Sequence, residues 1–442
     1  MTTFRSAFSR LRGLLDGLDP APGLEPVELH LGDYRGETPA APFDALGDVA
    51  GWCRYPPLEG TAAQRAAYLG WLERGFGQGR DLPASIAVEP TPGSKQAVAA
   101  AIMLAAGAAR QRGDGVPRVV LPNPFYPTYL GATEAAGAEP VFYAVGGASA
   151  TGTSAAGGSA VGISAAGVSP GRSAGTGRDD DPLGAVAGVA AALDRAGGRA
   201  AAVVVCNPGN PRGEILPVPA LRAIWRLATA AGATLVVDEC YTDLGLRAAP
   251  PGFVTVAGAA EGGPFLVLHS LSKRSGAPGL RSGFVVGDAA TVAGYAAFNR
   301  SCGVSSPLPV CAAAAGLWSD DGHVERRRDA LRRVWDVADE LVGDLPGYRR
   351  AAAGFFLWLP VADDEDAARR LWQDAALRAM PGRYLAVEDG GVNPGAGHLR
   401  LALVHEEKVM ARALERLRAV LTGNAVPTGG RAAAITRTRG RD

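Results

Sequence analysis

Residues 269–284 read HSLSKRSGAPGLRSGF and follow the apolar run at 265–268. Lys273 lies close to two serines in this stretch, and Arg281 follows eight residues later. Taken alone, the stretch fits a solvated turn after a buried strand as well as it fits a binding site, because Lys, Ser, Gly and Pro are ordinary loop residues. The sequence on either side decides between these two interpretations.

Strands and helices alternate around this stretch, a pattern that is typical of an α/β fold. Apolar runs of strand length occur at 118–122, 140–145, 201–206, 233–239, 265–270 and 283–288. Such continuous runs suit the strands of a parallel sheet that is buried on both faces. Helical stretches lie between them, for example at 94–111 and 218–232. The sequence therefore predicts a mostly parallel sheet between two layers of helices.

The chain is long enough for two or three domains, since it has 442 residues. We expect a large domain at 51–300 and a smaller α+β domain at 301–421, joined by an N-terminal arm at 1–50. Residues 146–180 are almost all Gly, Ser, Ala and Thr, which indicates a flexible surface loop inserted into the large domain. The Gly- and Arg-rich tail at 422–442 is also predicted to be flexible.

Composition argues against several classes of partner. Lys plus Arg and Asp plus Glu number 44 each, so net charge gives no reason to expect a nucleic acid or a membrane surface. No apolar run approaches the roughly 18 residues that span a bilayer. The five cysteines form no CxxC pair and have no metal-ligand spacing, which favours free thiols in the cytoplasm and no metal site.

The first 15 residues carry arginines and no acidic residue, a composition that also fits a transit peptide. The spacing of their apolar residues favours a short helix docked on the body of the protein instead. The apolar face of that helix is predicted to consist of Phe8, Leu11, Leu14 and Leu15.

Several of the predicted strands end in polar residues, and in open α/β sheets such ends face the ligand. Asn210 follows the strand at 201–206, Asp238 and Tyr241 follow the next strand, and Lys273 follows the strand at 265–270. Gly93-Ser94-Lys95 precedes a long helix, whose free amides and dipole attract anions. The early strands are not followed by GxGxxG, so a nicotinamide-dependent enzyme is not supported.

Pyridoxal 5′-phosphate is a ligand that needs all of these groups. Its aldehyde requires a lysine, and its phosphate requires amides, hydroxyls and an arginine. Its pyridine nitrogen requires a carboxylate partner, so that the ring can act as an electron sink. Its flat ring requires an aromatic side chain to stack on.

These motifs also carry a resemblance. SxSK with an arginine eight residues on, Asp-x-x-Tyr and the NPGNPRG stretch at 207–213 resemble those of the class I/II aminotransferases of fold type I, which depend on pyridoxal phosphate. AFSRLRGLLDGLDP (7–20) and LPNPFYPTYLGATEAAGAEPVFY (121–143) make the chain most similar to the N-succinyl-diaminopimelate aminotransferases. The resemblance covers nearly the whole chain and implies a seven-stranded, mostly parallel sheet.

The resemblance implies a role for each cofactor contact. Lys273 would form the Schiff base and shuttle the proton, Asp238 would hold the pyridine nitrogen, and Tyr241 and Asn210 would bind the phenolic oxygen. Tyr126 would stack on the ring. The groups implied at the phosphate are the side chains of Arg281, Ser270 and Ser272 and the backbone amides of Gly93, Ser94 and Lys95, whose own side chain need not take part. Arg212 stands where the family usually has Thr, which leaves the packing of that loop open.

Other residues are implied at the substrate and at the subunit interface. Arg400 would clamp the substrate α-carboxylate, and the Gly32 amide would approach the same group. Asp33-Tyr34 departs from the acid-Pro step that the family has there. Arg300 is a weaker candidate for a distal carboxylate. Tyr55 would reach the phosphate of the neighbouring subunit, which implies a homodimer with shared active sites.

The resemblance therefore implies a transaminase of lysine and diaminopimelate biosynthesis, and the free cysteines favour the cytoplasm. Glutamate would be the amino donor, and N-succinyl-2-amino-6-oxopimelate the acceptor. Within the same family, aspartate or LL-diaminopimelate remains an alternative substrate. A pyridoxal-phosphate-binding regulator without catalysis is the alternative from another class, but only about 30 residues precede HLGDYRG (30–36), with no helix-turn-helix pattern.

Overall fold

The central element of the molecule is a seven-stranded sheet, seen in a computed structural model that describes residues 6–36, 38–77, 86–145, 182–257 and 262–427. The strand order is β2-β8-β7-β6-β5-β3-β4. In chain order the strands are β2 (Ile86–Thr91), β3 (Arg118–Asn123), β4 (Glu139–Ala144), β5 (Ala202–Cys206), β6 (Thr234–Asp238), β7 (Phe265–Ser270) and β8 (Gly283–Asp288). Strands β3 to β7 pair in parallel, and β8 pairs antiparallel with both β7 and β2.

The six predicted strands are confirmed, whereas β2 was not predicted. The sequence of β2 is IAVEPT, in which Glu89 and Pro90 interrupt the apolar run. Proline is tolerated there because β2 lies at the edge of the sheet, where a missing N–H breaks fewer ladder hydrogen bonds.

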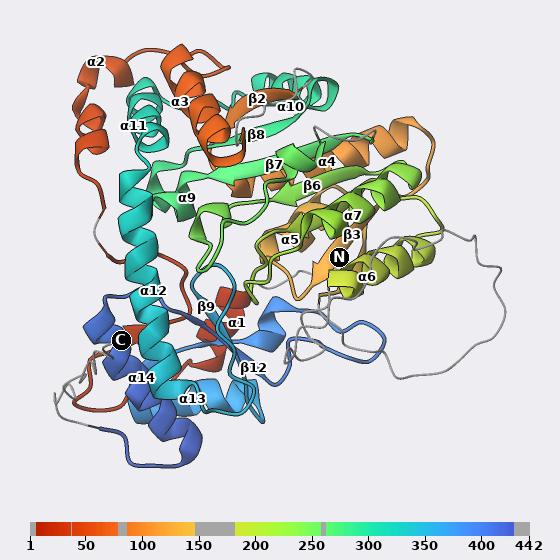
Figure 1. Cartoon of the computed structure of the whole chain (residues 1–442). Coiled ribbons are helices and arrows are strands. Elements are labelled where there is room, and N and C mark those ends of the chain that lie inside the picture. The colour runs from red at the N-terminus through yellow and green to blue at the C-terminus, as the bar shows by residue number, and fades with distance from the viewer. Residues whose placement is uncertain (1–5, 37, 78–85, 146–181, 258–261, 428–442) are drawn as a thin grey trace, which may run out of the picture.

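Helices cover both faces of this sheet (Figure 1). One face carries α4 (Ser94–Gln111), α5 (Pro127–Ala135) and α10 (Ala289–Ser301). The other carries α3 (Ala62–Leu72), α6 (Pro182–Arg195), α7 (Val218–Ala230), α8 (Phe253–Ala257) and α11 (Leu308–Ser319). Each face of the sheet has its own hydrophobic core, because successive strand residues point to opposite faces. In β5, Val203 packs in one core and Val204 in the other. The predicted α/β architecture is confirmed.

A second group of elements lies beside the carboxyl ends of the strands (Figure 1). It contains the antiparallel sheet β11-β12-β9, made by Met380–Pro381, His398–Ala402 and Phe356–Pro360. Around that sheet lie α1 (Ala7–Leu14), α12 (Gly322–Val342), α13 (Asp364–Ala375) and α14 (Glu407–Thr422). The short helices α2 (Val49–Trp52) and α9 (Leu271–Arg274) belong to the connections around the large sheet.

The N-terminal segment joins this second group through a short parallel pair. Strand β1 (Val27–Glu28) pairs with β10 (Leu377–Arg378), residues that are far apart in the sequence. An association of the first 50 residues with the C-terminal part was expected, but the proposed domain boundaries remain a prediction. The predicted loop at 146–180 and residues 428–442 of the predicted tail lie outside the described residues.

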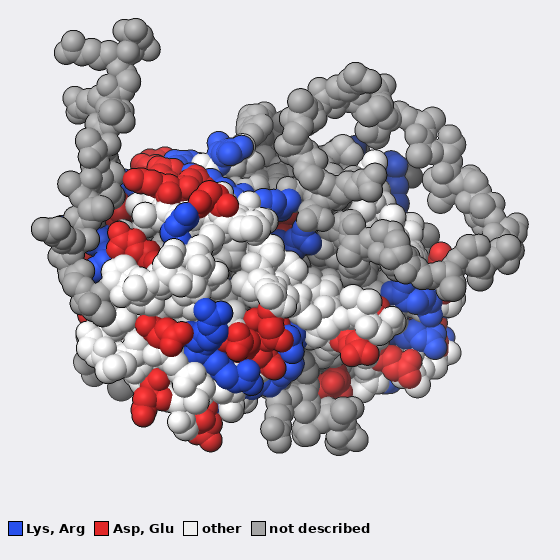
Figure 2. Space-filling model, turned by 90° about the horizontal axis from the view of Figure 1, so that it is seen from below, with Lys and Arg blue, Asp and Glu red and all other residues white. Residues whose placement is uncertain are grey.

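Further observations concern membrane-spanning helices, cysteines, metal ligands and surface charge. Among the described residues, no helix combines the length and the apolar character that crossing a membrane requires. All five cysteines are free, as predicted. The described part of the chain holds no group of three or more His, Cys, Asp or Glu side chains that could bind a metal ion. Figure 2 shows acidic and basic side chains side by side over one face of the molecule.

Candidate active site

A cavity of about 460 Å³ lies where the parallel strands of the large sheet end, between that sheet and the second group of elements. Most of the predicted site residues line it: Gly32, Ser94, Lys95, Tyr126, Asn210, Asp238, Tyr241, Ser272, Lys273, Arg281 and Arg400. Of the remaining predicted residues, Gly93 and Ser270 lie directly behind this lining, beside Arg281 and Ser272. Tyr55 and Arg300 are exposed and do not belong to the described lining.

Lys273 lies on a short helical turn directly after β7. Ser270 ends the strand and caps α9, because its hydroxyl accepts a hydrogen bond of 3.2 Å from the Ser272 amide. The Lys273 Nζ donates a hydrogen bond of 2.6 Å to the carbonyl oxygen of Gly32. Burial lowers the pKa of Lys273, and the charges of Arg327 and Arg400 lower it further. A lysine in this state loses its proton more readily and can act as a nucleophile or a base.

Asp238 ends the neighbouring strand β6 and is 3% exposed. Its carboxylate accepts hydrogen bonds from the Tyr129 hydroxyl at 2.8 Å and from the Cys240 amide at 3.2 Å. No Lys, Arg or His side chain in the described residues forms an ion pair with it. Burial therefore raises the pKa of Asp238, and the hydrogen bonds from Tyr129 and Cys240 only partly oppose this. The carboxylate is set up to receive a cationic N–H group from the cavity.

Tyr129 is fully buried, as an aromatic residue of the core would be. The sequence reasoning missed that its hydroxyl reaches Asp238. Tyr126 and Tyr129 are three residues apart at the start of α5, a spacing that places both on the same face of the helix. Because Tyr126 was predicted to face the ligand, this spacing was the signal that could have revealed Tyr129.

We expect Tyr129→Phe to weaken cofactor binding about 10-fold, since a hydrogen bond to a charged group contributes about 1.5 kcal/mol. Loss of the hydroxyl raises the pKa of Asp238 further, and a protonated acid no longer stabilises a cationic ring nitrogen. Fluorescence titration of the apoprotein with cofactor measures the change. Tyr143→Phe is the matched control, because the buried Tyr143 hydroxyl donates to the backbone oxygen of Val204 at 3.0 Å. If Tyr129→Phe and Tyr143→Phe weakened cofactor binding equally, the role assigned to the Tyr129 hydroxyl would be contradicted.

Arg400 lies on β12 at the opposite side of the cavity and is 4% exposed. Its Nη1 donates to the Asn210 Oδ1 at 3.3 Å, and its Nη2 donates to the backbone oxygen of His30 at 3.1 Å. Its Nε has no hydrogen-bond partner among the described residues. Burial lowers the pKa of Arg400 to about 10. A buried guanidinium with a free donor and no carboxylate beside it is suited to bind a carboxylate ligand.

Asn210 connects this arginine to Tyr241. The Asn210 Nδ2 lies 3.5 Å from the Tyr241 hydroxyl, while the Asn210 Oδ1 accepts from Arg400. The neighbouring Asn207 turns away and accepts a hydrogen bond from the Leu216 amide. Arg212, the residue that departs from the family pattern, donates to the backbone oxygen of Val145 at 2.7 Å and so anchors its loop.

The third part of the cavity is rich in donors for an anion. Arg281 adopts a left-handed backbone with φ 54°, and its guanidinium donates to the backbone oxygens of Pro92 and Pro278. Gly93 precedes the first residue of α4 and has φ +86°. A Cβ on Gly93 would lie 2.7 Å from the Arg281 Nη2, so only glycine lets the arginine lie across the start of this helix.

The N-terminal helix contributes one wall of the cavity. Leu11 and Leu15 are buried and Leu14 is half-buried, as predicted for a docked helix. The prediction that Phe8 belongs to the docked face is wrong, because Phe8 is 40% exposed and lines the cavity. Its ring makes an edge contact with His30, whose backbone oxygen binds Arg400. Phe8 therefore lies on the Arg400 side of the cavity.

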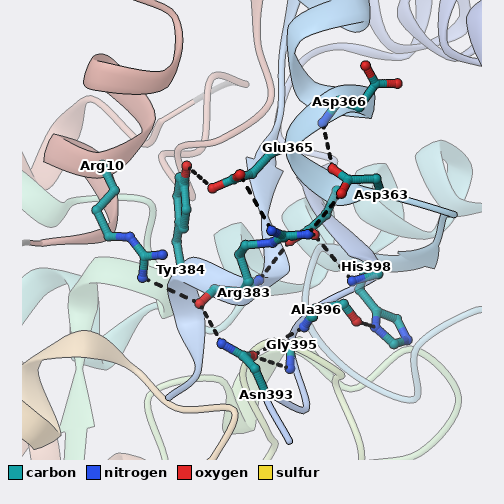
Figure 3. A network of polar contacts seen from close by, with 12 residues as sticks. Arg10, Asp363, Glu365, Asp366, Arg383, Tyr384, Asn393, Gly395, Ala396 and His398 are labelled. Atoms are coloured by element: carbon teal, nitrogen blue, oxygen red, sulfur yellow. Dashed lines mark hydrogen bonds and ion pairs between the residues drawn. The ribbon is translucent and has the colours of Figure 1, made fainter. Parts of the chain in front are cut away.

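A network of charged residues fixes this wall (Figure 3). The Arg383 Nε donates to the fully buried Asp364 at 2.7 Å, and the Tyr384 hydroxyl donates to Glu365 at 2.6 Å. Arg10 of α1 lies over the Tyr384 ring, 3.9 Å from its centroid. The network ties α1 to the start of α13 and to the segment that carries Leu385, another residue of the cavity wall.

The arrangement fits pyridoxal phosphate by the chemistry of its donors and acceptors. Asp238 is a buried carboxylate and Arg400 a buried guanidinium, neither has an ion-pair partner in the described ranges, and both face the same cavity. Lys273 lines the same cavity, and the donors around Arg281 form a separate anion site. These are the groups that a ring nitrogen, an aldehyde, a phosphate and a substrate carboxylate require.

Comparisons with known proteins agree with this chemistry. The family model "Aminotransferase class I and II" matches residues 180–417. The chain is 31% identical over 398 residues to the 4-dedimethylamino-4-oxo-anhydrotetracycline transaminase OxyQ of Streptomyces rimosus, covering 88% of this chain and 92% of that protein. It is 27% identical to an LL-diaminopimelate aminotransferase of Desulforudis audaxviator, over 94% of this chain and 95% of the relative.

A solved structure supports the fold. The crystal structure of an aminotransferase from Neisseria meningitidis superimposes with a TM-score of 0.80 at 28% identity, over 95% of this chain and 100% of that one. The fold is therefore that of the fold-type I aminotransferases, as the resemblance implied.

Proposed function

The chain belongs to the class I and II aminotransferase family, whose members depend on pyridoxal 5′-phosphate, and from this premise we propose its substrates and the roles of its residues. We propose that glutamate donates the amino group and that N-succinyl-2-amino-6-oxopimelate accepts it, a step of lysine and diaminopimelate biosynthesis. The motifs at 7–20 and 121–143 support this choice of acceptor. The free cysteines support a cytoplasmic location.

The observation that carries the proposal is that Lys273 and Arg400 face one cavity. Arg400 holds the substrate α-carboxylate in a two-pronged contact and so fixes the α-carbon relative to the lysine. The Lys273 Nζ donates a hydrogen bond to the carbonyl oxygen of Gly32. The segment at 31–33 therefore lies next to the lysine amine. The cofactor, when bound, supplies the electron sink for breaking a bond at the α-carbon.

The remaining cavity residues orient the cofactor. Asp238 keeps the proton on the ring nitrogen, and Tyr241 and Asn210 bind the phenolic oxygen. Tyr126 packs on the ring face, with Arg281 and the start of α4 at the phosphate. Lys273 would hold the cofactor through its aldehyde and, once the substrate amine has displaced it, its free amine would carry the proton from the substrate α-carbon to the cofactor. Its lowered pKa provides the neutral amine that this task needs.

Exposed apolar residues at and after α2 support a homodimer. Tyr55 is completely exposed at 102% and follows α2, whose residues Val49 and Trp52 are exposed as well. An exposed apolar patch of this kind favours contact with a second copy. We propose that Tyr55 reaches the phosphate of the neighbouring subunit, so that each active site is shared.

Relatives favour a second candidate substrate. The diaminopimelate aminotransferase relative aligns over nearly the full chain, which supports LL-diaminopimelate as a substrate. The similarity to OxyQ supports a third, a bulky ketone, against which Phe8 and Leu385 offer apolar surface. A regulator without catalysis is disfavoured, because relatives that align over 88% and 94% of the chain are named a transaminase and an aminotransferase.

A panel of acceptors tests the proposal. Pure holoenzyme is incubated with glutamate and each oxo compound, and 2-oxoglutarate formation is measured. We expect kcat/KM for N-succinyl-2-amino-6-oxopimelate to exceed that for oxaloacetate by at least about 100-fold, a ratio that corresponds to roughly 3 kcal/mol of differential transition-state binding. A higher value with LL-diaminopimelate as donor to 2-oxoglutarate would replace the proposed substrate. Absence of amino transfer to any acceptor would refute the enzyme assignment itself.

A further inference from the structure

Arg327, on α12, is a buried cation that forms no ion pair within the described part of the chain. Its side chain is 5% exposed, and neither Nη1 nor Nη2 has a hydrogen-bond partner among the described residues. Its guanidinium lies over the ring of Tyr34, 4.0 Å from the centroid. Burial lowers the pKa of Arg327 to about 10. Burying an unpaired charge is unfavourable, so this arginine requires an explanation.

The neighbouring Arg274 shows how the fold satisfies a buried arginine in the same region. Arg274 is 2% exposed and forms ion pairs with Asp243 at 3.1 Å and with Asp321 at 2.6 Å. Two carboxylates thus neutralise Arg274. Arg327 has no carboxylate partner among the residues that the structure describes, so these residues leave its charge uncompensated.

The position of Arg327 directs this charge at the turn that carries Lys273. His323, one helical turn earlier on α12, lies 2.9 Å from the Ser275 hydroxyl. Arg327 lies over the next residue, Gly276, where an added Cβ would come within 2.6 Å of the Nη1. Gly276 has φ +65°, a conformation that glycine adopts readily. Two successive turns of α12, at His323 and Arg327, therefore contact Ser275 and Gly276, which follow Lys273 closely in the chain.

The ring of Tyr34 completes this contact from the N-terminal side. A Cβ on Gly276 would lie 2.9 Å from the Tyr34 Cδ1, so the ring and the guanidinium share the same glycine. Two residues before Tyr34, the carbonyl oxygen of Gly32 accepts the hydrogen bond from the Lys273 Nζ. The stack of Arg327 on Tyr34 thus fixes the segment that contacts Lys273.

We propose that Arg327 is a positioning residue for amino transfer, which acts on Lys273 in two ways. Its unpaired charge disfavours a positive charge at the Lys273 nitrogen, and its stack on Tyr34 holds Gly32 against that nitrogen. This inference rests on the proposed function in one respect, namely that Lys273 is the lysine that binds the cofactor.

Other charged and titratable groups face Lys273 and set the background for the effect. Asp33, beside Gly32, and Cys240, after β6, favour a positive charge at its nitrogen in their ionised forms. Arg400 on β12 opposes it, as Arg327 does. A substitution of Arg327 leaves Asp33, Cys240 and Arg400 in place. A change in the protonation of the Lys273 nitrogen can then be assigned to Arg327.

The test is the pH midpoint of the visible absorption change of the holoenzyme, which reports the proton at the nitrogen that links Lys273 to the cofactor. Arg327→Met removes the charge and keeps much of the apolar stem. Without the cation the protonated form is favoured, so the midpoint should rise by roughly 0.5–1.5 pH units. Arg326→Met removes the same charge from an exposed position on the same helix, and its midpoint should stay within about 0.2 units of wild type, because solvent screens it.

Further variants keep the proposal testable if Arg327→Met does not fold. Arg327→Gln is a second neutral substitution and should shift the midpoint in the same direction. Arg327→Lys restores the charge and should return the midpoint to within about 0.2 units of wild type. A neutral variant that shifts no more than Arg326→Met, or a lysine that fails to restore the midpoint, overturns the proposal. A wild-type protein that shows no visible band with added cofactor overturns instead the function on which it rests.

Discussion

Lys273→Ala is expected to abolish the yellow colour of the holoenzyme and to lower kcat by on the order of 10⁴-fold. The variant loses both the amine that binds the cofactor aldehyde and the base that moves the α-proton. The chain has three lysines, Lys95, Lys273 and Lys408, so the assignment can be checked residue by residue. Borohydride reduction of the wild-type holoenzyme followed by peptide mapping should find the cofactor on the peptide that contains Lys273.

Lys95→Ala is the matched control, because Lys95 also lines the cavity but is exposed at the start of α4. It should keep the colour and reduce kcat by less than about 10-fold, since an exposed charge contributes little to binding. Label on Lys95 or Lys408, or a coloured and active Lys273→Ala variant, would contradict the assignment.

Arg400→Lys is expected to weaken both half-reactions while leaving the fold and the colour intact. A point charge cannot reproduce the planar fork of a guanidinium, and losing one charge-assisted contact costs about 2–4 kcal/mol, or roughly 30- to 1000-fold in kcat/KM. The melting temperature should change little, because Arg400 has no acidic partner in the described part of the chain to lose. Single-turnover rates with glutamate and with the oxo acid, measured beside a melting curve, give both quantities.

Arg378→Lys is the control for this prediction. Arg378 forms an ion pair with Glu28 at 2.9 Å and lies over the Trp372 ring, so its role is to support the structure. The Arg378→Lys variant should have a slightly lower melting temperature and unchanged rates in both half-reactions. If Arg400→Lys behaved like Arg378→Lys, Arg400 would have no place in substrate binding.

The fold could be predicted because its strands are continuous apolar runs with helices between them. Both faces of β5 are buried, and its run of valines reflects this directly. Strand β2 escaped prediction because an edge strand needs less apolar sequence, as Glu89 and Pro90 show. The α1 helix was predicted from its apolar spacing, yet that spacing defines a stripe more than 100° wide, and Phe8 at its border faces the cavity.

The site could be predicted where a motif fixes the chemistry, as for Lys273 and Arg281. It could not be predicted where the role depends on the direction of a buried side chain. Tyr129 belongs to the core by composition, and only the structure shows where its hydroxyl points. Arg327 lies in the run ERRRD (325–329), which reads as a solvated helix face, and nothing in that run separates it from the exposed Arg326.

The pairing of β1 with β10 has a consequence for engineering by recombination. The proposed cofactor contacts within the chain lie between residues 93 and 281, whereas Phe8, Gly32 and Arg400 come from the two flanking segments, which that pairing joins. A chimaera that takes both flanks from one relative and the middle from another keeps each set of contacts whole. Exchanging a single flank mismatches β1 against β10. Crossover points for altering substrate range are therefore best chosen in pairs, one on each side of the middle segment.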